Sequence, residues 1–282
     1  MEAQRQPVQL AGERASYWQF ELNQQLPAHF YAANGFPVPA YRHLLTALSS
    51  HYSLTALDNR ALWPDQPRQP AGRMRCRQYA GDLVRFLETT APGPVVGIGH
   101  SMGATTTVMA AAARPDLFHS LVLIEPVLQS AWAATLARQL PKAVLARTQL
   151  IKTTLMSPGS WPDRAAAWRF YRSHRAYRYL SDEHLDVLLD GLLEPTTDGV
   201  QLQFSREWEV ANYMGIDAVW RELTQLSMPV RVIRAKPSLF LPEASWQRLQ
   251  RLLPEGEFID IPQQRHLLPM ENPTLTVESI VS

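Results

Sequence analysis

The sequence has 282 residues, of which 46% are hydrophobic, and its formal net charge at pH 7 is +1. This hydrophobic content suffices for a sizeable core and argues against an intrinsically disordered chain, while the length fits one large α/β domain or a core with an inserted subdomain. The nearly neutral charge gives no electrostatic reason to expect binding to nucleic acid or to an anionic membrane.

The N-terminal residues and the cysteine content bear on location and on cofactors. Residues 1–6 are polar, without the apolar core of a signal peptide, and no run of about 18 apolar residues indicates a membrane span. We therefore expect a soluble, cytoplasmic protein. The single cysteine, Cys76, offers neither an internal disulfide nor a metal-ligand cluster, and we interpret it as a bystander thiol. We expect no metal and no cofactor.

The first third of the chain alternates between short apolar runs and helical patterns. Gly12 separates two short predicted strands, and a buried strand ends in the sequence Asn34-Gly35-Phe36-Pro37. The apolar spacing predicts strands at residues 8–10, 15–20, 28–33 and 53–57, helices at 39–48 and 73–90, and a loop at 58–72.

The same alternation continues, is interrupted once, and then resumes. We predict strands at residues 94–99, 121–124, 230–233 and 258–261, and helices at 102–114, at 242–253 and from 272 to the end. Between the second and third of these strands, residues 127–226 read as mostly helical. The pattern predicts an α/β fold, with a mostly parallel central sheet and helices on both faces. Residues 1–126 and 227–282 would form its core, and residues 127–226 an inserted helical cap.

A candidate nucleophile lies where a predicted apolar strand meets a helix of small residues. The turn reads Gly99-His100-Ser101-Met102-Gly103. A sharp strand-to-helix turn brings neighbouring backbone close to the positions two residues either side of the serine, and glycine avoids the clash. The pattern predicts that Ser101 is a nucleophile. The alternative is an ordinary serine N-cap, which also opens helices.

Nearly the whole chain resembles the α/β-hydrolase family, in particular the serine hydrolases with a helical cap. Residues 94–104 are similar to the nucleophile strand and turn of that family, residues 34–37 to its oxyanion loop, and residues 265–273 to the segment with its catalytic histidine. The resemblance implies an oxyanion hole formed by the backbone N–H groups of Phe36 and Met102. It also implies that His266 is the general base, a role for which a pKa near neutrality suits histidine.

The acidic partner of the histidine is the point at which the sequence departs from the family pattern. In the family the acid usually follows the strand that corresponds to residues 230–233, but residues 234–242 contain no carboxylate. Glu243 comes next, in a predicted helix start. Our hypothesis is that Glu125, at the end of strand 121–124, is the acid. The alternatives are that Glu125 is only a structural residue at the entry to the cap, or that the site is a Ser–His dyad without a firm acid. We interpret Asp58 as a partner of Arg60 and Asp260 as solvated or locally paired.

The predicted cap is rich in aromatic residues and arginines. We expect most of its aromatic side chains to form the core of the cap, although such residues also line apolar acyl pockets. The arginines would form a solvated basic face or, alternatively, a clamp for a carboxylate or phosphate. The aromatic residues are Trp132, Trp161, Trp168, Phe170, Tyr171, Tyr177, Tyr179, Phe204, Trp208 and Tyr213, and the arginines are Arg164, Arg169, Arg172, Arg175 and Arg178.

These features together favour a serine hydrolase that cleaves a carboxylic ester or a related acyl bond through an acyl-enzyme on Ser101. Its substrate would be a small acyl compound, with an apolar part if the cap aromatics line the pocket. Two alternatives remain open: a non-catalytic binding protein on the same fold, which the missing acid after residues 230–233 favours, and a lyase or cofactor-free haloperoxidase that uses the same site.

Overall fold

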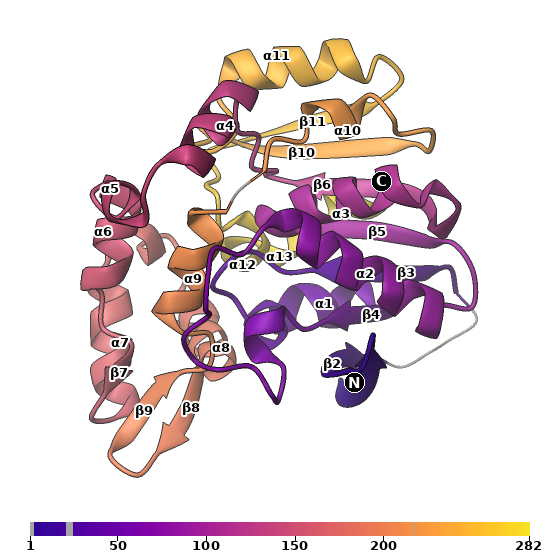
Figure 1. Cartoon of the computed structure of the whole chain (residues 1–282). Helices are drawn as coiled ribbons and strands as arrows, with labels where there is room; N and C mark the ends of the chain where they lie inside the picture. The colour runs from indigo at the N-terminus through magenta and orange to yellow at the C-terminus, as the bar shows by residue number, and fades with distance from the viewer. Residues whose placement is uncertain (1–2, 21–24, 216) are drawn as a thin grey trace.

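The computed structural model describes residues 3–20, 25–215 and 217–282. In this part of the chain an eight-stranded sheet has the order β1-β2-β4-β3-β5-β6-β10-β11 (Figure 1). The strands are β1 (Gln4–Leu10), β2 (Glu13–Gln19), β3 (Pro27–Tyr31), β4 (Ser53–Leu57), β5 (Val95–His100), β6 (Phe118–Ile124), β10 (Val230–Lys236) and β11 (Glu257–Pro262). β2 pairs antiparallel with both β1 and β4. The other neighbours, in the sheet order β4-β3-β5-β6-β10-β11, pair parallel, which confirms the predicted mostly parallel sheet.

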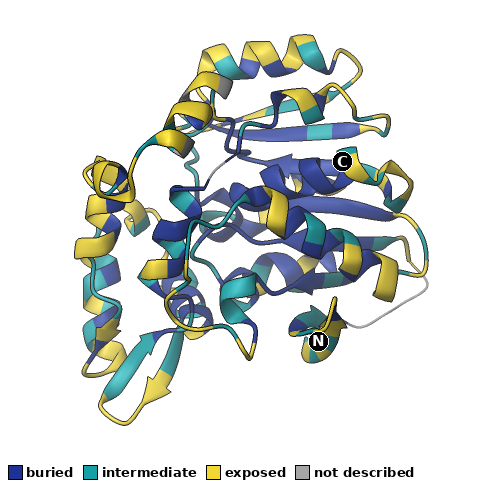
Figure 2. Ribbon diagram, in the orientation of Figure 1, coloured by how far each residue is buried: buried dark blue, intermediate teal, exposed yellow. Residues whose placement is uncertain are grey.

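Helices cover both faces of this sheet, as predicted, because the buried side chains of each strand alternate between two cores. In β6, Val122 and Ile124 join the core formed with α1 (Arg42–Leu48) and α13 (Pro273–Val281). Leu121 and Leu123 join the opposite core, formed with α2 (Cys76–Thr90), α3 (Met102–Ala113) and α11 (Glu243–Leu252). The central strands are consequently buried along their length, as Figure 2 shows.

Residues 127–226 lie between β6 and β10 in the chain, and most of their helices lie at one end of the sheet, on the left in Figure 1. The helices are α4 (Ala131–Gln139), α5 (Lys142–Leu145), α6 (Gln149–Met156), α7 (Arg164–Ser173), α8 (Asp182–Leu192), α9 (Arg206–Tyr213) and α10 (Trp220–Leu223). A small antiparallel sheet, which the sequence analysis did not predict, joins β7 (Ser160–Trp161), β9 (Gly199–Leu202) and β8 (Leu193–Thr196). The pair Asp198-Gly199 is a hairpin signal that could have indicated it.

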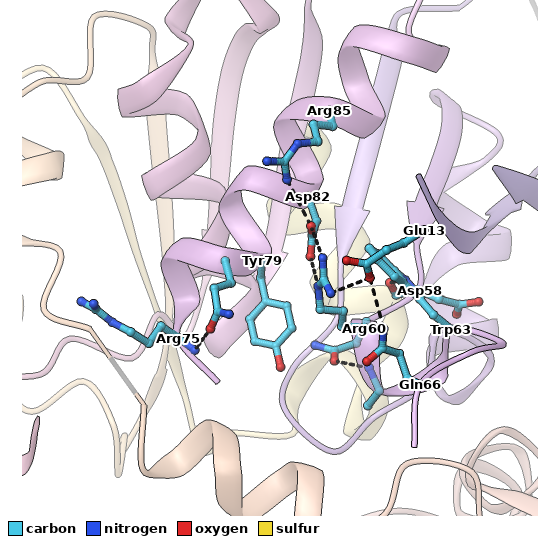
Figure 3. A network of polar contacts seen from close by, with 12 residues as sticks. Glu13, Asp58, Arg60, Trp63, Gln66, Arg75, Tyr79, Asp82 and Arg85 are labelled. Atoms are coloured by element: carbon cyan, nitrogen blue, oxygen red, sulfur yellow. Dashed lines mark hydrogen bonds and ion pairs between the residues drawn. The ribbon is translucent and has the colours of Figure 1, made fainter. Parts of the chain in front are cut away.

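The prediction that Asp58 pairs with Arg60 is wrong. Asp58 is buried at the end of β4, where its carboxylate accepts hydrogen bonds from Arg5 and Ser16, each over 2.8 Å. Arg60 instead extends toward α2 and forms a two-pronged ion pair with Asp82, at 2.8 and 3.0 Å (Figure 3). Their side chains diverge because Asp58 faces β2 whereas Arg60 belongs to a short 3-10 turn over α2.

Two further expectations concern Cys76 and the membrane. Cys76 begins α2 and is buried, and burial raises the pKa of its thiol to about 12, so the neighbouring arginines do not activate it. Among the described residues, no helix combines the length and the apolar composition that a membrane crossing requires.

Candidate active site

The predicted nucleophile turn has the strained geometry that its sequence indicates. Ser101 joins β5 to α3 with φ 56° and ψ −118°, in the left-handed half of conformational space. Its N–H donates to the carbonyl of Ile124 over 2.9 Å, which ties the turn to β6. A Cβ at Gly99 would lie 2.6 Å from the Cα of Ala104, and one at Gly103 would lie 2.1 Å from the carbonyl oxygen of Tyr31. Both positions therefore require glycine.

The structure brings Ser101, His266 and Glu125 together in that order. The Oγ of Ser101 lies 2.9 Å from Nε2 of His266, and the Nδ1 of His266 lies 3.1 Å from Oε2 of Glu125. A carboxylate can only accept, so His266 donates Nδ1–H to Glu125 and its Nε2 accepts the hydroxyl proton of Ser101. This tautomer is the one that a general base for Ser101 needs.

The carboxylate of Glu125 is fully buried, and the surrounding chain supplies its hydrogen bonds. Its Oε1 accepts from the backbone N–H of Ala235 and its Oε2 accepts from the hydroxyl of Ser238, both over 2.8 Å. The Ser238 hydroxyl in turn accepts the N–H of Leu241 over 2.9 Å, which orients its proton toward Glu125. The loop after β10 thus contributes a hydrogen-bond donor to Glu125 where the family usually has the acid itself.

Two other carboxylates near this edge of the sheet, Glu243 and Asp260, lie in ion pairs with Arg234. Glu243 opens α11, as predicted, and its carboxylate lies 3.0 Å from a guanidinium nitrogen of Arg234. Asp260 contacts the same guanidinium at 2.6 Å, in keeping with the expectation of local pairing. Glu125 is the carboxylate that contacts His266 among the described residues.

The structure adds a supporting residue that the sequence patterns did not reveal: the buried His100 contacts the backbone of His266. The hydroxyl of Tyr41 accepts the N–H of Ala33 over 3.0 Å, so its own proton points to Nδ1 of His100, 2.8 Å away. The Nε2–H of His100 then donates to the backbone carbonyl of His266 over 2.8 Å. Burial lowers the pKa of His100 well below its ordinary value, so the ring is neutral and this arrangement of donors holds.

The two predicted oxyanion donors lie on opposite sides of Ser101 in the sequence. Met102 is the first residue of α3, so its N–H has no acceptor within the helix and lies at the positive end of the helix dipole. The N–H of Phe36 makes a long 3.3 Å turn contact with the carbonyl of Ala33. An oxyanion at Phe36 would therefore compete with this weak bond. Gly35, beside it, has φ +83°, which explains the glycine in this loop.

A cavity of about 800 Å³ contains the Ser101 hydroxyl and the His266 ring. One part of its wall comes from the core, through Phe36, Met102 and the segment 237–240. The rest comes from residues 127–226, chiefly α6, the stretch from Phe170 to Tyr179, and α9. The candidate nucleophile therefore faces a partly open cavity of the size that small-molecule sites have, with walls from both parts of the chain.

The aromatic residues of the inserted segment divide into core and lining. Trp161, Tyr171, Phe204 and Trp208 are buried, which is fewer than the expected majority of the ten, and Trp132 is 73% exposed. The residues that line the cavity are Phe170, Tyr177, Tyr179 and Tyr213.

Some arginines of the inserted segment form ion pairs, and others line the cavity. Arg164 pairs with Asp186 and Asp190, and Arg172 pairs with Asp182. Arg175 and Arg178 instead line the cavity, together with Arg265 from the core.

Comparison with known proteins places these observations in a family. The chain is 23% identical over 246 residues to 2-(acetamidomethylene)succinate hydrolase from Mesorhizobium japonicum, covering 86% of this chain and 82% of that protein. It is 27% identical to lipase LipV from Mycobacterium tuberculosis, over 68% and 69% of the two chains. The crystal structure of E-2-(acetamidomethylene)succinate hydrolase matches with a TM-score of 0.79 at 20% identity, over 99% of this chain and 98% of that one.

The family comparison extends over almost all of the fold. The model of the alpha/beta hydrolase family matches residues 16–279, which include the strand β5, the turn at Ser101 and the segment that carries His266. The chain belongs to the alpha/beta hydrolase family.

Proposed function

We propose that this protein is a serine hydrolase that cleaves a carboxylic ester or a related acyl bond of a small molecule. The observation that carries the proposal is the continuous chain of hydrogen bonds from Ser101 through His266 to the buried Glu125, over 2.9 and 3.1 Å, with Ser101 and His266 in the wall of a cavity of about 800 Å³. Such a chain is the arrangement that activates a serine hydroxyl for attack on a carbonyl.

In the proposed reaction His266 takes the proton of Ser101 as its Oγ attacks the acyl carbon. The resulting oxyanion accepts hydrogen bonds from the N–H groups of Met102 and Phe36, while Glu125 stabilises the protonated imidazole. His266 then returns the proton to the leaving group, whose bond to the acyl carbon breaks. Water, deprotonated by His266, attacks the acyl-enzyme and releases the acid and free Ser101. In this proposal residues 127–226 act as a cap that encloses the substrate.

The non-catalytic alternative rested on the missing acid after residues 230–233. Because Glu125 contacts His266 at 3.1 Å and Ser238 supports it from that loop, this observation no longer favours a binding protein.

The proposal is tested by treating the purified protein with a fluorophosphonate probe and locating the adduct by mass spectrometry. We expect rapid labelling confined to Ser101, no labelling of the Ser101→Ala variant, and hydrolysis of p-nitrophenyl esters by the unmodified protein only. A folded protein that neither reacts with the probe nor cleaves any ester would contradict the proposal.

A further inference from the structure

Four arginines line the cavity that contains Ser101, namely Arg175, Arg178, Arg206 and Arg265, and two of them converge on one tyrosine. The guanidinium carbon of Arg178 lies 4.6 Å from the ring centroid of Tyr179, and that of Arg265 lies 4.8 Å from the same centroid. Both guanidinium groups also donate to the phenolic oxygen of Tyr179. Two like charges are thus held close together in the wall of the cavity that the candidate nucleophile also lines.

Arg178 and Arg265 differ from Arg164 and Arg172 in whether an acidic partner lies close to the guanidinium group. Within the described part of the chain, no carboxylate lies within 4.0 Å of Arg178 or Arg265, whereas Arg164 and Arg172 have acidic partners at 2.8–2.9 Å. The hydrogen bonds from Arg178 and Arg265 lower the pKa of the Tyr179 phenol.

The acidic groups of the cavity offset little of this charge. Glu209 is already engaged, because its carboxylate accepts from Arg206 over 2.8 Å and from Tyr213 over 3.1 Å. Burial raises the pKa of Glu271 to about 7, so this carboxyl group carries only part of a negative charge at neutral pH. Arg175, Arg178 and Arg265 therefore leave the cavity with an excess of positive charge.

We infer that the acyl substrate carries a carboxylate, and that Arg178 and Arg265 bind it across the Tyr179 ring. This inference rests on the proposed function. A planar guanidinium matches a carboxylate with two parallel hydrogen bonds, and two guanidinium groups that repel each other gain further from an anion placed between them. Leu150, Leu239 and Phe240 line the same cavity and leave an apolar stretch for the part of the acyl chain between carboxylate and scissile bond.

The position of Arg265 limits where the carboxylate lies. Arg265 directly precedes His266, and both side chains line the same cavity. A carboxylate bound by Arg265 and the exposed Arg178 consequently lies at the solvent-facing wall of the cavity that Ser101 also lines. Among the arginines singled out in the sequence, Arg164 and Arg172 thus form ion pairs, whereas Arg178 has a binding role in this inference.

The test compares two substrates that differ only in charge, mono-p-nitrophenyl adipate and its methyl ester, by release of p-nitrophenolate. We expect the unmodified protein to show a kcat/KM at least tenfold higher for the anionic ester, since a hydrogen-bonded ion pair contributes about tenfold or more. In the double variant Arg178→Gln/Arg265→Gln this ratio falls to within about threefold of unity, mainly through KM of the anionic ester. The control Arg169→Gln, an exposed arginine outside the cavity, keeps the original ratio.

The outcomes separate this inference from the proposed function. Labelling of Ser101 together with cleavage of both esters at equal rates would overturn the carboxylate assignment and leave the hydrolase proposal standing. A preference for the anionic ester that survives in the double variant would have the same meaning. A folded protein with neither labelling nor cleavage would overturn both.

A second arm distinguishes a carboxylate from a phosphate, because guanidinium groups bind either. Glutarate and inorganic phosphate are compared as competitive inhibitors of cleavage of the methyl ester. We expect glutarate to inhibit at the lower concentration and to lose its effect in the double variant. Stronger inhibition by phosphate would overturn the assignment to a carboxylate.

Discussion

The environment of Glu125 determines how much this one carboxylate matters. It is fully buried, has φ 48°, and shares its two oxygens among Ala235, Ser238 and His266. A glutamine at this position keeps the size but replaces one acceptor oxygen by a donor NH2 group. The amide can then favour the wrong tautomer of His266, and it cannot stabilise the protonated ring.

We therefore predict that Glu125→Gln lowers kcat for a p-nitrophenyl ester at least tenfold. The matched control is Glu243→Gln, because Glu243 lies in the segment after β10, where the family usually has its acid, but pairs with Arg234. The control is expected to retain kcat within about twofold. Full activity in Glu125→Gln, measured beside a normal circular dichroism spectrum, would exclude Glu125 as the acid.

The residues of the candidate site differ in how far the sequence could indicate them. Ser101 and His266 lie in local patterns, and Glu125 ends a strand, so each could be named before the structure was known. Ser238 and His100 could not, because their partners lie 113 and 166 residues away in the chain. Polar contacts at such separations depend on the register of the whole sheet, which no local pattern encodes.

At the scale of elements, the close approach of α3 to β3 fixes the nucleophile turn. We predict that Gly103→Ala lowers the free energy of unfolding by about 3 kcal/mol or prevents folding, because its Cβ would lie 2.1 Å from the carbonyl oxygen of Tyr31. Gly93→Ala, in the loop before β5, has nothing within 4 Å of the new Cβ and should change stability by about 0.5 kcal/mol or less. Urea denaturation measures both, and equal stability of the two variants would refute the argument.

The elements themselves could largely be predicted, and the misses have physical causes. Strands such as β5 and β6 contain unbroken apolar runs, at residues 95–99 and 121–124, so their patterns are unambiguous. The strand β7 has two residues and α12 (Leu268–Glu271) has four, which is too short for a periodicity to appear. The predicted partner of Asp58 was wrong because Arg60 is close only in sequence, whereas Ser16 contacts Asp58 from a neighbouring strand of the sheet.

At the scale of the whole molecule, two buried histidines make stability depend on pH. Burial lowers the pKa of His29 to about 3 and lowers that of His100 well below 6.5. Below pH 6.5 the unfolded chain binds a proton at each site that the folded protein does not, so stability falls as the pH decreases. Each histidine contributes a slope of up to about 1.4 kcal/mol per pH unit.

Glu271 acts in the opposite direction and provides the test. Its folded pKa of about 7 exceeds the ordinary value of 4.5, so between these values the folded state binds the extra proton and gains stability as the pH falls. We predict that stability decreases from pH 6.5 to 5.5 in the unmodified protein, and decreases more steeply in Glu271→Gln. Urea denaturation at both pH values measures this, and a parallel decline in the two proteins would contradict it.

The pairing of β5 with β6 has a consequence for how this protein can change. His100 of β5 pairs with Ile124 of β6, so Ser101 and Glu125 each directly follow one member of the same residue pair at the end of the sheet. Their separation is set by backbone that is complete before residue 127, whereas Arg178 and most of the cavity wall come from the stretch that follows. Exchange of residues 127–226 with another member of the family would therefore give a chimera with a new selectivity and the same reacting groups, which makes this stretch the natural unit for redesign.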